Sequence, residues 1–290
     1  MRRVIVPFVG ICAALAAGIA LGGGPLSDLG HASTTAKPGH RVSVLVRAQA
    51  AAGQKLAAAT APMLYAGKLA GQQVAIIALP GAPESVVTTL ASQVGAAGGA
   101  VTGTTHVTPT AVDPASKTLV DTLGSQLAGQ LHGLVDPAQP TYVRLGQLLG
   151  GAVATTTPAA ATPSADQATT LAALGQSKLV TATGAPTAAP LVLLVLGTHV
   201  DPTILSGLVQ GLATRSHGLV VAGSTGSGLR GDLKRLRAHG LGAQATHVAT
   251  VDGDEQPIGQ LATTLALVHQ IAGGGGAYGP SGHDGVAPLG

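Results

Sequence analysis

Four continuous apolar runs constrain the fold of this chain more than any other feature of its sequence. They read "VAIIAL" from Val74, "LVLLVLG" from Leu191, "GLVVAG" from Gly218 and "HVATVD" from His247. Segments with a helical pattern separate them. Strands that are apolar on both sides must be covered on both faces, so we predict an α/β fold with a mostly parallel sheet and helices on both faces. The crossovers should be right-handed.

Helix-start signals fit this alternation. Pro83–Glu84, Asp113 and Asp201–Pro202 each place a proline or a capping acid where a helix should begin. Two further strands are predicted from "AVTGTTHVT" and "LVTATG". The predicted helices begin at Pro83 or span Pro114–Leu131, Thr141–Ala154, Gln167–Leu174, 201–215, "LRGDLKRLRAHG" up to Gly240, and Pro257–Ala272.

The composition determines what the core is made of and which partners are excluded. Apolar residues make up 46% of the chain and aromatic residues 1%, so the core must be packed from Val, Leu, Ile and Ala. The net charge is +3, and the basic residues are scattered without interleaved aromatics. This distribution argues against nucleic acid as a partner.

The N-terminal residues are predicted to form a membrane anchor. Val4–Leu21 is uncharged, and the apolar stretch continues to Leu26, which is long enough to cross a bilayer. Arg2 and Arg3 precede it, so we expect a single-pass protein with its N-terminus in the cytoplasm and its C-terminal domain outside. Small-residue triplets near Ala16–Ala20 leave a cleaved signal peptide as the alternative.

A ladder of small residues runs along this predicted span at four-residue intervals: Gly10, Ala14, Gly18 and Gly22. Such ladders allow membrane helices to approach closely, so the ladder is our candidate contact for a homo-oligomer or an envelope partner protein. Ladders of this kind also arise by chance in Ala/Gly-rich helices.

The rest of the chain divides by its pattern. We assign 1–26 to the anchor, 27–68 to a juxtamembrane helical segment, and 69–272 to the α/β domain. The domain includes a predicted flexible insertion at 155–166, and a glycine-rich tail follows at 273–290, with no reason to fold alone.

The juxtamembrane segment carries a weak heptad seam that the sequence predicts to stop at Pro62–Met63. A short coiled coil and a single helix lying on the domain are both compatible with it. The seam consists of Leu45, Gln49, Ala52, Leu56, Ala59 and Met63.

Two stretches could carry ligand chemistry. The glycine-rich turn "AGSTGSGLR" from Ala222 could cradle a phosphate, but it lacks both GxGxxG and a Walker sequence, which favours a plain strand-to-helix loop. His199 and Asp201 follow the central strand, where Asp252 and Glu84 could converge with them. The alternative is that the acids cap loops and helices.

No residue pattern indicates an enzyme. GxSxG is absent, and Cys12, the only cysteine, lies in the predicted membrane segment. We therefore predict no catalytic residues, no cofactor and no enzymatic activity. The ten histidines form no HxH, HxxxH or HExxH pair, so His283 in "PSGHDG" is only a weak candidate for metal contact.

Three blocks carry a family resemblance: "AALAAGIALGGGPLSD", "GKLAGQQVAIIALPGA" and "HVATVDGDEQPIGQLATTLALVHQIAGGGGAYG". The last is the most specific, through Ala249–Asp252, Pro257, Gly259, Leu265–Leu267 and the Gly-Tyr that follows. In these blocks the chain resembles the actinobacterial copper transporter family, the relatives of mycobacterial copper transport protein B.

The resemblance implies a membrane-anchored envelope protein that keeps intracellular copper low, with copper as a possible transported ion. It also implies an alternative role, because other members are implicated in cell separation and envelope integrity together with a partner. Relatives carry a charged coiled coil where Ala32–Met63 is rich in alanine. One predicted span cannot enclose a pore, so a conduit would need several copies.

Overall fold

The computed structural model describes residues 38–290 except 131–132, 160, 163, 184–186, 245 and 290. It divides into two compact units, Met1–Ala50 and Ala51–Gly290, and the second contains the sheet. The predicted anchor at 1–26, with Gly10, Ala14, Gly18 and Gly22, lies outside the described residues. Among the helices that are described, none is long and apolar enough to cross a membrane.

The apolar runs form the centre of a sheet whose described strands number seven, in the order β3-β2-β1-β4-β5-β6-β7. The four central strands pair in parallel, and their buried faces confirm the predicted α/β fold with a mostly parallel sheet. The strands are β1 (Gln73–Ala78), β2 (Ala100–Val107), β3 (Val180–Thr183), β4 (Leu191–Val195), β5 (Gly218–Gly223), β6 (Val248–Asp252) and β7 (Gly276–Tyr278).

One edge strand runs against the others. β3 pairs with β2 in the antiparallel direction, with Val107 opposite Val180. The preceding helix ends beside the carboxyl end of β2, where the Thr108 N–H donates to the Leu179 carbonyl at 2.9 Å. The chain therefore enters β3 from that end and must run back along β2.

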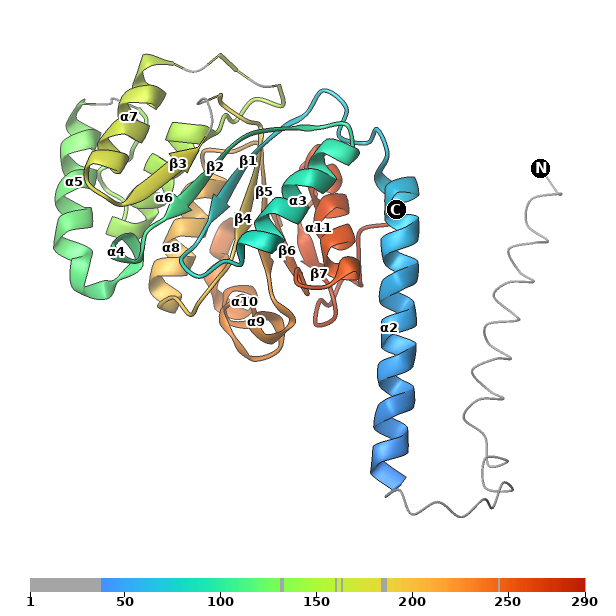
Figure 1. Cartoon of the computed structure of the whole chain (residues 1–290). Coiled ribbons are helices and arrows are strands. Elements are labelled where there is room, and N and C mark those ends of the chain that lie inside the picture. The colour runs from blue at the N-terminus through green and yellow to red at the C-terminus, as the bar shows by residue number, and fades with distance from the viewer. Residues whose placement is uncertain are drawn as a thin grey trace, which may run out of the picture. The chain divides into compact units, whose positions relative to one another are not determined.

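Helices cover both faces of the sheet, as Figure 1 shows. α3 and α11 lie on one face, and α5, α6, α7 and α8 lie on the other. The helical segments are α2 (Pro38–Tyr65), α3 (Glu84–Ala96), α4 (Pro109–Val112), η2 (Pro114–Ser116), α5 (Lys117–Gln130), α6 (Thr141–Val153), α7 (Ala165–Gln176), α8 (Pro202–Ala213), α9 (Thr225–Arg230), α10 (Asp232–Arg235), η3 (Leu236–Gly240), η4 (Gly242–Gln244) and α11 (Pro257–Gln270).

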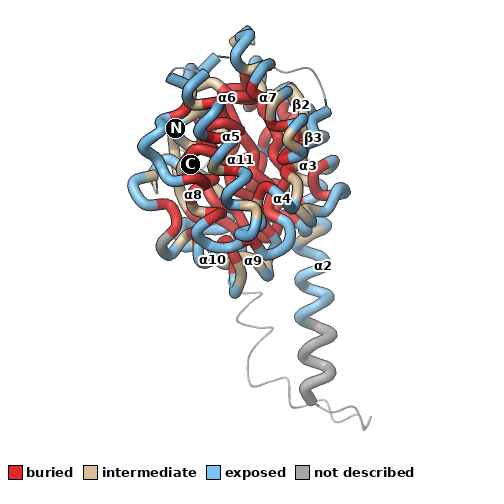
Figure 2. Tube along the Cα trace, turned by 90° about the vertical axis from the view of Figure 1, so that its left-hand side faces the viewer, coloured by how far each residue is buried: buried red, intermediate tan, exposed pale blue. Residues whose placement is uncertain are grey.

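The core consists of two apolar layers separated by the sheet, as the alternation of side chains along a strand requires. In β1, Ile76 points into the layer under α3 and α11, whereas Ile77 points into the layer under α6 and α8. Figure 2 shows both layers as the buried interior. Val, Leu, Ile and Ala make up most of both layers, as predicted.

Glycines let α6 and α8 pack with their backbones in contact. Every residue of α6 is buried, and α8 crosses it at Gly146 and Gly211. A Cβ on Gly211 would lie 2.1 Å from the Val143 carbonyl oxygen, and one on Gly146 would lie 2.4 Å from the Leu208 carbonyl oxygen. Any side chain at these positions would force the two helices apart.

The C-terminal half of α2 lies on the domain through one face only. Ala57, Ala61 and Tyr65 are buried, and the Gln54 Oε1 accepts a bond of 3.1 Å from the Ile258 N–H. This confirms the prediction of a helix lying on the domain. The helix itself passes the exposed Pro62, which removes one backbone bond, and ends at the buried Tyr65, shortly after the last seam residue Met63.

The seam residues within Ala51–Tyr65 are exposed. The exposed fraction is 65% for Leu56 and 83% for Met63, and Ala52 and Ala59 beside them are exposed too. The coiled coil therefore stays a prediction for this free face.

The segment after β5 differs from the prediction. "LRGDLKRLRAHG" is not one amphipathic helix, because Gly231 adopts φ −102°, ψ −146° and separates α9 from α10. The glycine-rich turn is itself helical, since Ser224 caps α9 through a bond of 3.2 Å from the Ser227 N–H.

The glycine-rich tail at 273–290, which the sequence gives no reason to fold alone, folds here as part of the sheet. β7 pairs in parallel with β6, with Val251 opposite Tyr278. The Asp284 carboxylate accepts a bond of 2.8 Å from the Ala277 N–H, and the Asp284 N–H donates to the Ala277 carbonyl at 2.9 Å. The pairing of β7 with β6 uses backbone groups, which leave no side-chain pattern in the sequence.

The insertion at 155–166 connects α6 to α7. The Thr155 N–H donates to the Ala189 carbonyl at 3.0 Å, and the Ala161 N–H donates to the Ala188 carbonyl at 3.1 Å. The flexibility of this segment stays a prediction.

We expect Gly211→Ala to destabilise the domain by about 3 kcal/mol, because the new methyl group meets backbone atoms that cannot move independently. Gly129→Ala in α5 is the matched control. Its Cβ would have open space, so the free energy of unfolding should rise by about 0.5–1 kcal/mol. Denaturant unfolding of both variants measures the difference, and equal stabilities would contradict the close contact.

Candidate functional site

The first place to look for a ligand site is the carboxyl edge of the sheet between β1 and β4. The strand order reverses there, and open α/β sheets bind ligands at such a point. In this chain the loops after the two strands fill the position. The Thr198 N–H and hydroxyl donate to the Pro80 carbonyl at 2.8 and 2.9 Å.

Gly197 makes that closure possible. A Cβ at this position would lie 2.1 Å from the Ala82 nitrogen and 2.2 Å from the Pro80 oxygen. The two loops thus touch through their backbones, and the expected crevice is occupied by the chain itself.

His199 points instead toward the segment after β5. Its Nδ1 lies 2.5 Å from Asp232 Oδ1, and the second oxygen of Asp232 accepts a bond of 2.9 Å from the Val200 N–H. Arg235 Nη1 donates to Oδ1 at 3.2 Å. Asp232 is buried, whereas the His199 side chain is 65% exposed, so this carboxylate holds the ring in place and leaves Nε2 facing outward.

An open cleft of about 330 Å³ lies beside His199, and we call it the β4–β5 cleft. Its polar lining comes from the two loops that follow these strands. The side chains that line it belong to His199, Ser224, Ser227, Arg230, Asp232 and Arg235.

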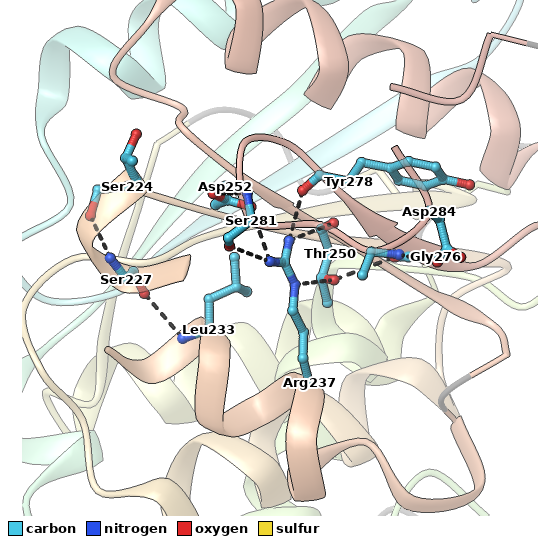
Figure 3. A network of polar contacts seen from close by, with 12 residues as sticks. Ser224, Ser227, Leu233, Arg237, Thr250, Asp252, Gly276, Tyr278, Ser281 and Asp284 are labelled. Carbon is cyan, nitrogen blue, oxygen red and sulfur yellow. Dashed lines mark hydrogen bonds and ion pairs between the residues drawn. The ribbon is translucent and has the colours of Figure 1, made fainter. Parts of the chain in front are cut away.

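The glycine-rich turn in this cleft uses its own N–H groups. Ser224 Oγ accepts from the Ser227 N–H, and both carboxylate oxygens of Glu255 accept from the Thr225 N–H at 3.0 and 3.1 Å. Ser227 Oγ accepts from the Leu233 N–H at 3.1 Å (Figure 3). These bonds favour the plain loop over a phosphate cradle.

The other acids that could have joined His199 lie apart from it in structural roles. Asp201 caps α8 and accepts from the Thr203 N–H at 2.8 Å. Glu84 is exposed in the first turn of α3. Asp252 is buried in a separate network described below. The four residues therefore do not form one site, and the capping alternative is confirmed for Asp201.

That network surrounds Arg237, whose guanidinium is buried between η3 and the end of the sheet (Figure 3). It donates to Asp252 Oδ1 at 3.0 Å, to Thr250 Oγ1 at 2.9 Å and to Ser281 Oγ at 2.9 Å. It also donates to the backbone carbonyls of Thr250 and Tyr278 at 3.2 and 2.7 Å. All three of its nitrogens are satisfied, so Arg237 holds the tail against β6.

Asp254 is the buried acid without such compensation. Its exposed fraction is 2%, and its Oδ2 has no hydrogen-bond partner in the described residues. Burial, with the negative charges of Glu255 and Asp252 adding to it, raises the pKa of Asp254 to about 7.

The histidines do not assemble a metal centre in the part of the chain that the structure describes, where three His, Cys, Asp or Glu side chains never gather. His283 is 78% exposed, and its Nε2 lies 3.2 Å from Asp284 Oδ2. Contact of His283 with copper stays a prediction, with the Asp284 carboxylate as its neighbour.

Sequence reasoning missed Asp232, Arg235, Arg237 and Asp254. The first three lie in the segment read as one amphipathic helix, where charges are usually solvent-exposed. The break at Gly231, which places an acid directly after a glycine, was the available signal.

The family comparison covers almost the whole chain. The model of the family described as "Copper transport outer membrane protein, MctB" matches residues 1–288. No curated protein matches the chain. The match includes the predicted anchor, α2, the sheet and the tail that Arg237 holds.

We expect Arg237→Met to lower the free energy of unfolding by about 3–5 kcal/mol, because it leaves Asp252 buried without a counter-ion. Arg235→Met, at a half-exposed position of α10, should cost less than about 1 kcal/mol. Chemical denaturation of both variants separates them, and a mild effect of Arg237→Met would contradict the role of the network.

We expect Asp254 to destabilise the fold as the pH rises. Its folded pKa of about 7 exceeds the unfolded value of 3.8, so the unfolded state loses its proton first. Stability should fall by up to ~1.4 kcal/mol for each pH unit within that window and then level off above it. Asp254→Asn should remove this slope, which unfolding curves between pH 4 and 8 would reveal.

The control for this measurement is Asp136→Asn. The Ala138 N–H and Gln139 lower the pKa of the Asp136 carboxyl, so its contribution should be lost as the pH falls rather than as it rises. A wild-type slope that persists in Asp254→Asn would rule out Asp254 as its source.

Proposed function

Because the chain belongs to the MctB family of copper transport outer membrane proteins, we propose that it is a membrane-anchored cell-envelope protein acting in copper homeostasis and efflux, as an oligomer or with a partner. The observation that carries this proposal is the family match over residues 1–288, which includes every segment of the chain. Copper is the transported ion in this role and no resident cofactor is required.

The proposal places the sheet domain outside the cytoplasm, behind a retained N-terminal anchor. Arg2 and Arg3 before the uncharged stretch support this orientation, since positive flanks stay on the cytoplasmic side. The length of Val4–Leu21 supports retention over cleavage.

A non-enzymatic role agrees with the carboxyl edge of the sheet. The position where α/β enzymes of this strand order bind their ligands is filled by Gly197, Thr198 and the loop at Pro80–Ala82. The neighbouring glycine-rich loop uses its N–H groups for bonds to Ser224 and Glu255. Both observations support a domain that does not turn over a substrate at this edge.

Assembly is supported by the free face of α2. Leu56 and Met63, seven residues apart, are exposed on the side opposite Ala57, Ala61 and Tyr65. An apolar seam that the domain leaves uncovered suits a second helix, since heptad spacing keeps such positions on one face. The predicted ladder in the anchor would bring the same helices of neighbouring copies together.

Deletion of the protein should raise the copper content of the cells and their sensitivity to copper, because an efflux component is lost. Wild-type protein should restore tolerance. Gly18→Leu with Gly22→Leu should not restore it, because leucine side chains prevent close packing of the anchor helices. Metal analysis of cells, growth on copper and chemical cross-linking of the membrane fraction measure these effects.

Ala16→Leu with Ala20→Leu is the matched control, since it adds the same bulk on another face of the predicted helix and should restore tolerance. Chained cells with unchanged copper tolerance in the deletion strain would contradict the copper role. That result would support instead a non-enzymatic scaffold for cell separation and envelope integrity.

A further inference from the structure

A groove of about 690 Å³ lies between α8 and the α10–η3 segment, and we call it the α8–η3 groove. Its floor is formed by Leu205 and Leu236, which are almost completely buried, and Pro202 and Ala238 lie at its edges. A groove of this volume is the size of a small-molecule site. A stable protein partner would need a much larger contact surface.

The rim of the groove is strongly basic. Arg230, Lys234 and Arg235 line it, and all three are exposed. Asp232 is the only acid in the lining, and its oxygens are already engaged by His199, the Val200 N–H and Arg235. Arg230 and Lys234 form no ion pair within the described part of the chain, so their charge is available to a ligand.

The groove adjoins the β4–β5 cleft, since both are lined by Arg230, Asp232 and Arg235. On the groove side of this boundary the floor is apolar. On the cleft side the lining is polar and carries the outward-facing Nε2 of His199. Arg230 and Arg235 therefore lie at the boundary between the apolar α8–η3 groove and the polar β4–β5 cleft.

We propose that the α8–η3 groove binds a single-chain amphiphile with an acidic headgroup, a carboxylate or a phosphate. The apolar chain lies along the groove, where it covers the exposed Pro202 and Ala238 and the apolar stems of the rim side chains and so removes apolar surface from water. Arg230 and Lys234 supply the free charge that binds the headgroup, and Arg235 lies beside them, since guanidinium groups match both carboxylate and phosphate geometry. The site does not depend on the role in copper homeostasis.

The test uses the full chain in nanodiscs of zwitterionic lipid and a photoreactive twelve-carbon fatty acid with a diazirine on its chain. After illumination, peptide mapping by mass spectrometry should place the label on residues 202–206 and 231–238. The alcohol of the same chain should label these peptides at least ~10-fold less, because it lacks the charge that the rim binds. Dodecyl phosphate should compete with the label, whereas inorganic phosphate at the same concentration should not.

Arg230→Gln with Lys234→Gln should reduce the labelling about 10-fold while the thermal unfolding temperature stays the same. Ala238→Trp should also abolish it, because the indole fills the groove from an exposed position. Arg47→Gln with Lys55→Gln removes the same charge from α2 and should leave the labelling unchanged.

Three results would overturn the proposal: equal labelling by the acid and the alcohol, labels confined to other peptides, or full labelling of the Arg230–Lys234 variant. Competition by inorganic phosphate as effective as that by dodecyl phosphate would also overturn it, because the apolar groove would then contribute nothing.

Discussion

The ion pair between Arg237 and Asp252 holds together parts of the chain that have little else to join them. Asp252 ends β6, Arg237 lies in a short helical turn, and the bonded carbonyl of Tyr278 belongs to a strand of only three residues. A strand that short cannot stay paired through its own ladder. A buried charge pair is stable only when its remaining hydrogen bonds are satisfied, and here Thr250, Ser281 and the tail satisfy them. The tail is therefore held to the sheet by buried polar bonds, and Ala277 and Tyr278 are buried with it.

The sheet was predictable from the sequence because burial on both faces leaves a mark in every residue of a strand, as in Leu191–Val195. Helix caps such as Asp201 were predictable because a cap bonds only to residues next to it in the sequence. The partner of His199 was not, since Asp232 lies 33 residues away and meets it only through the break at Gly231. β7 was not predictable either, because backbone bonds pair glycine as readily as valine. Local sequence patterns thus predicted the strands and the helix starts, whereas the polar contacts between distant residues depend on the three-dimensional arrangement.

The carboxyl edge of the sheet contains both a closed position and an open one. Between β1 and β4 the backbone at Gly197 excludes any ligand, and one strand further the β4–β5 cleft stays open beside His199. A fold that many enzymes use thus has its usual ligand position closed here, and a polar cleft lies one strand further along the same edge.

The position of β7 has a consequence for how the protein is made. A chain that is synthesised, or threaded across a membrane, from its N-terminus reaches residue 237 long before residues 278–284 emerge. Until then the guanidinium lacks the Tyr278 carbonyl and Ser281, and β6 is an open edge. The domain cannot complete its core while any part of its last segment is still inside the ribosome or the translocation channel. The sheet is complete only after that segment is free to pair with β6.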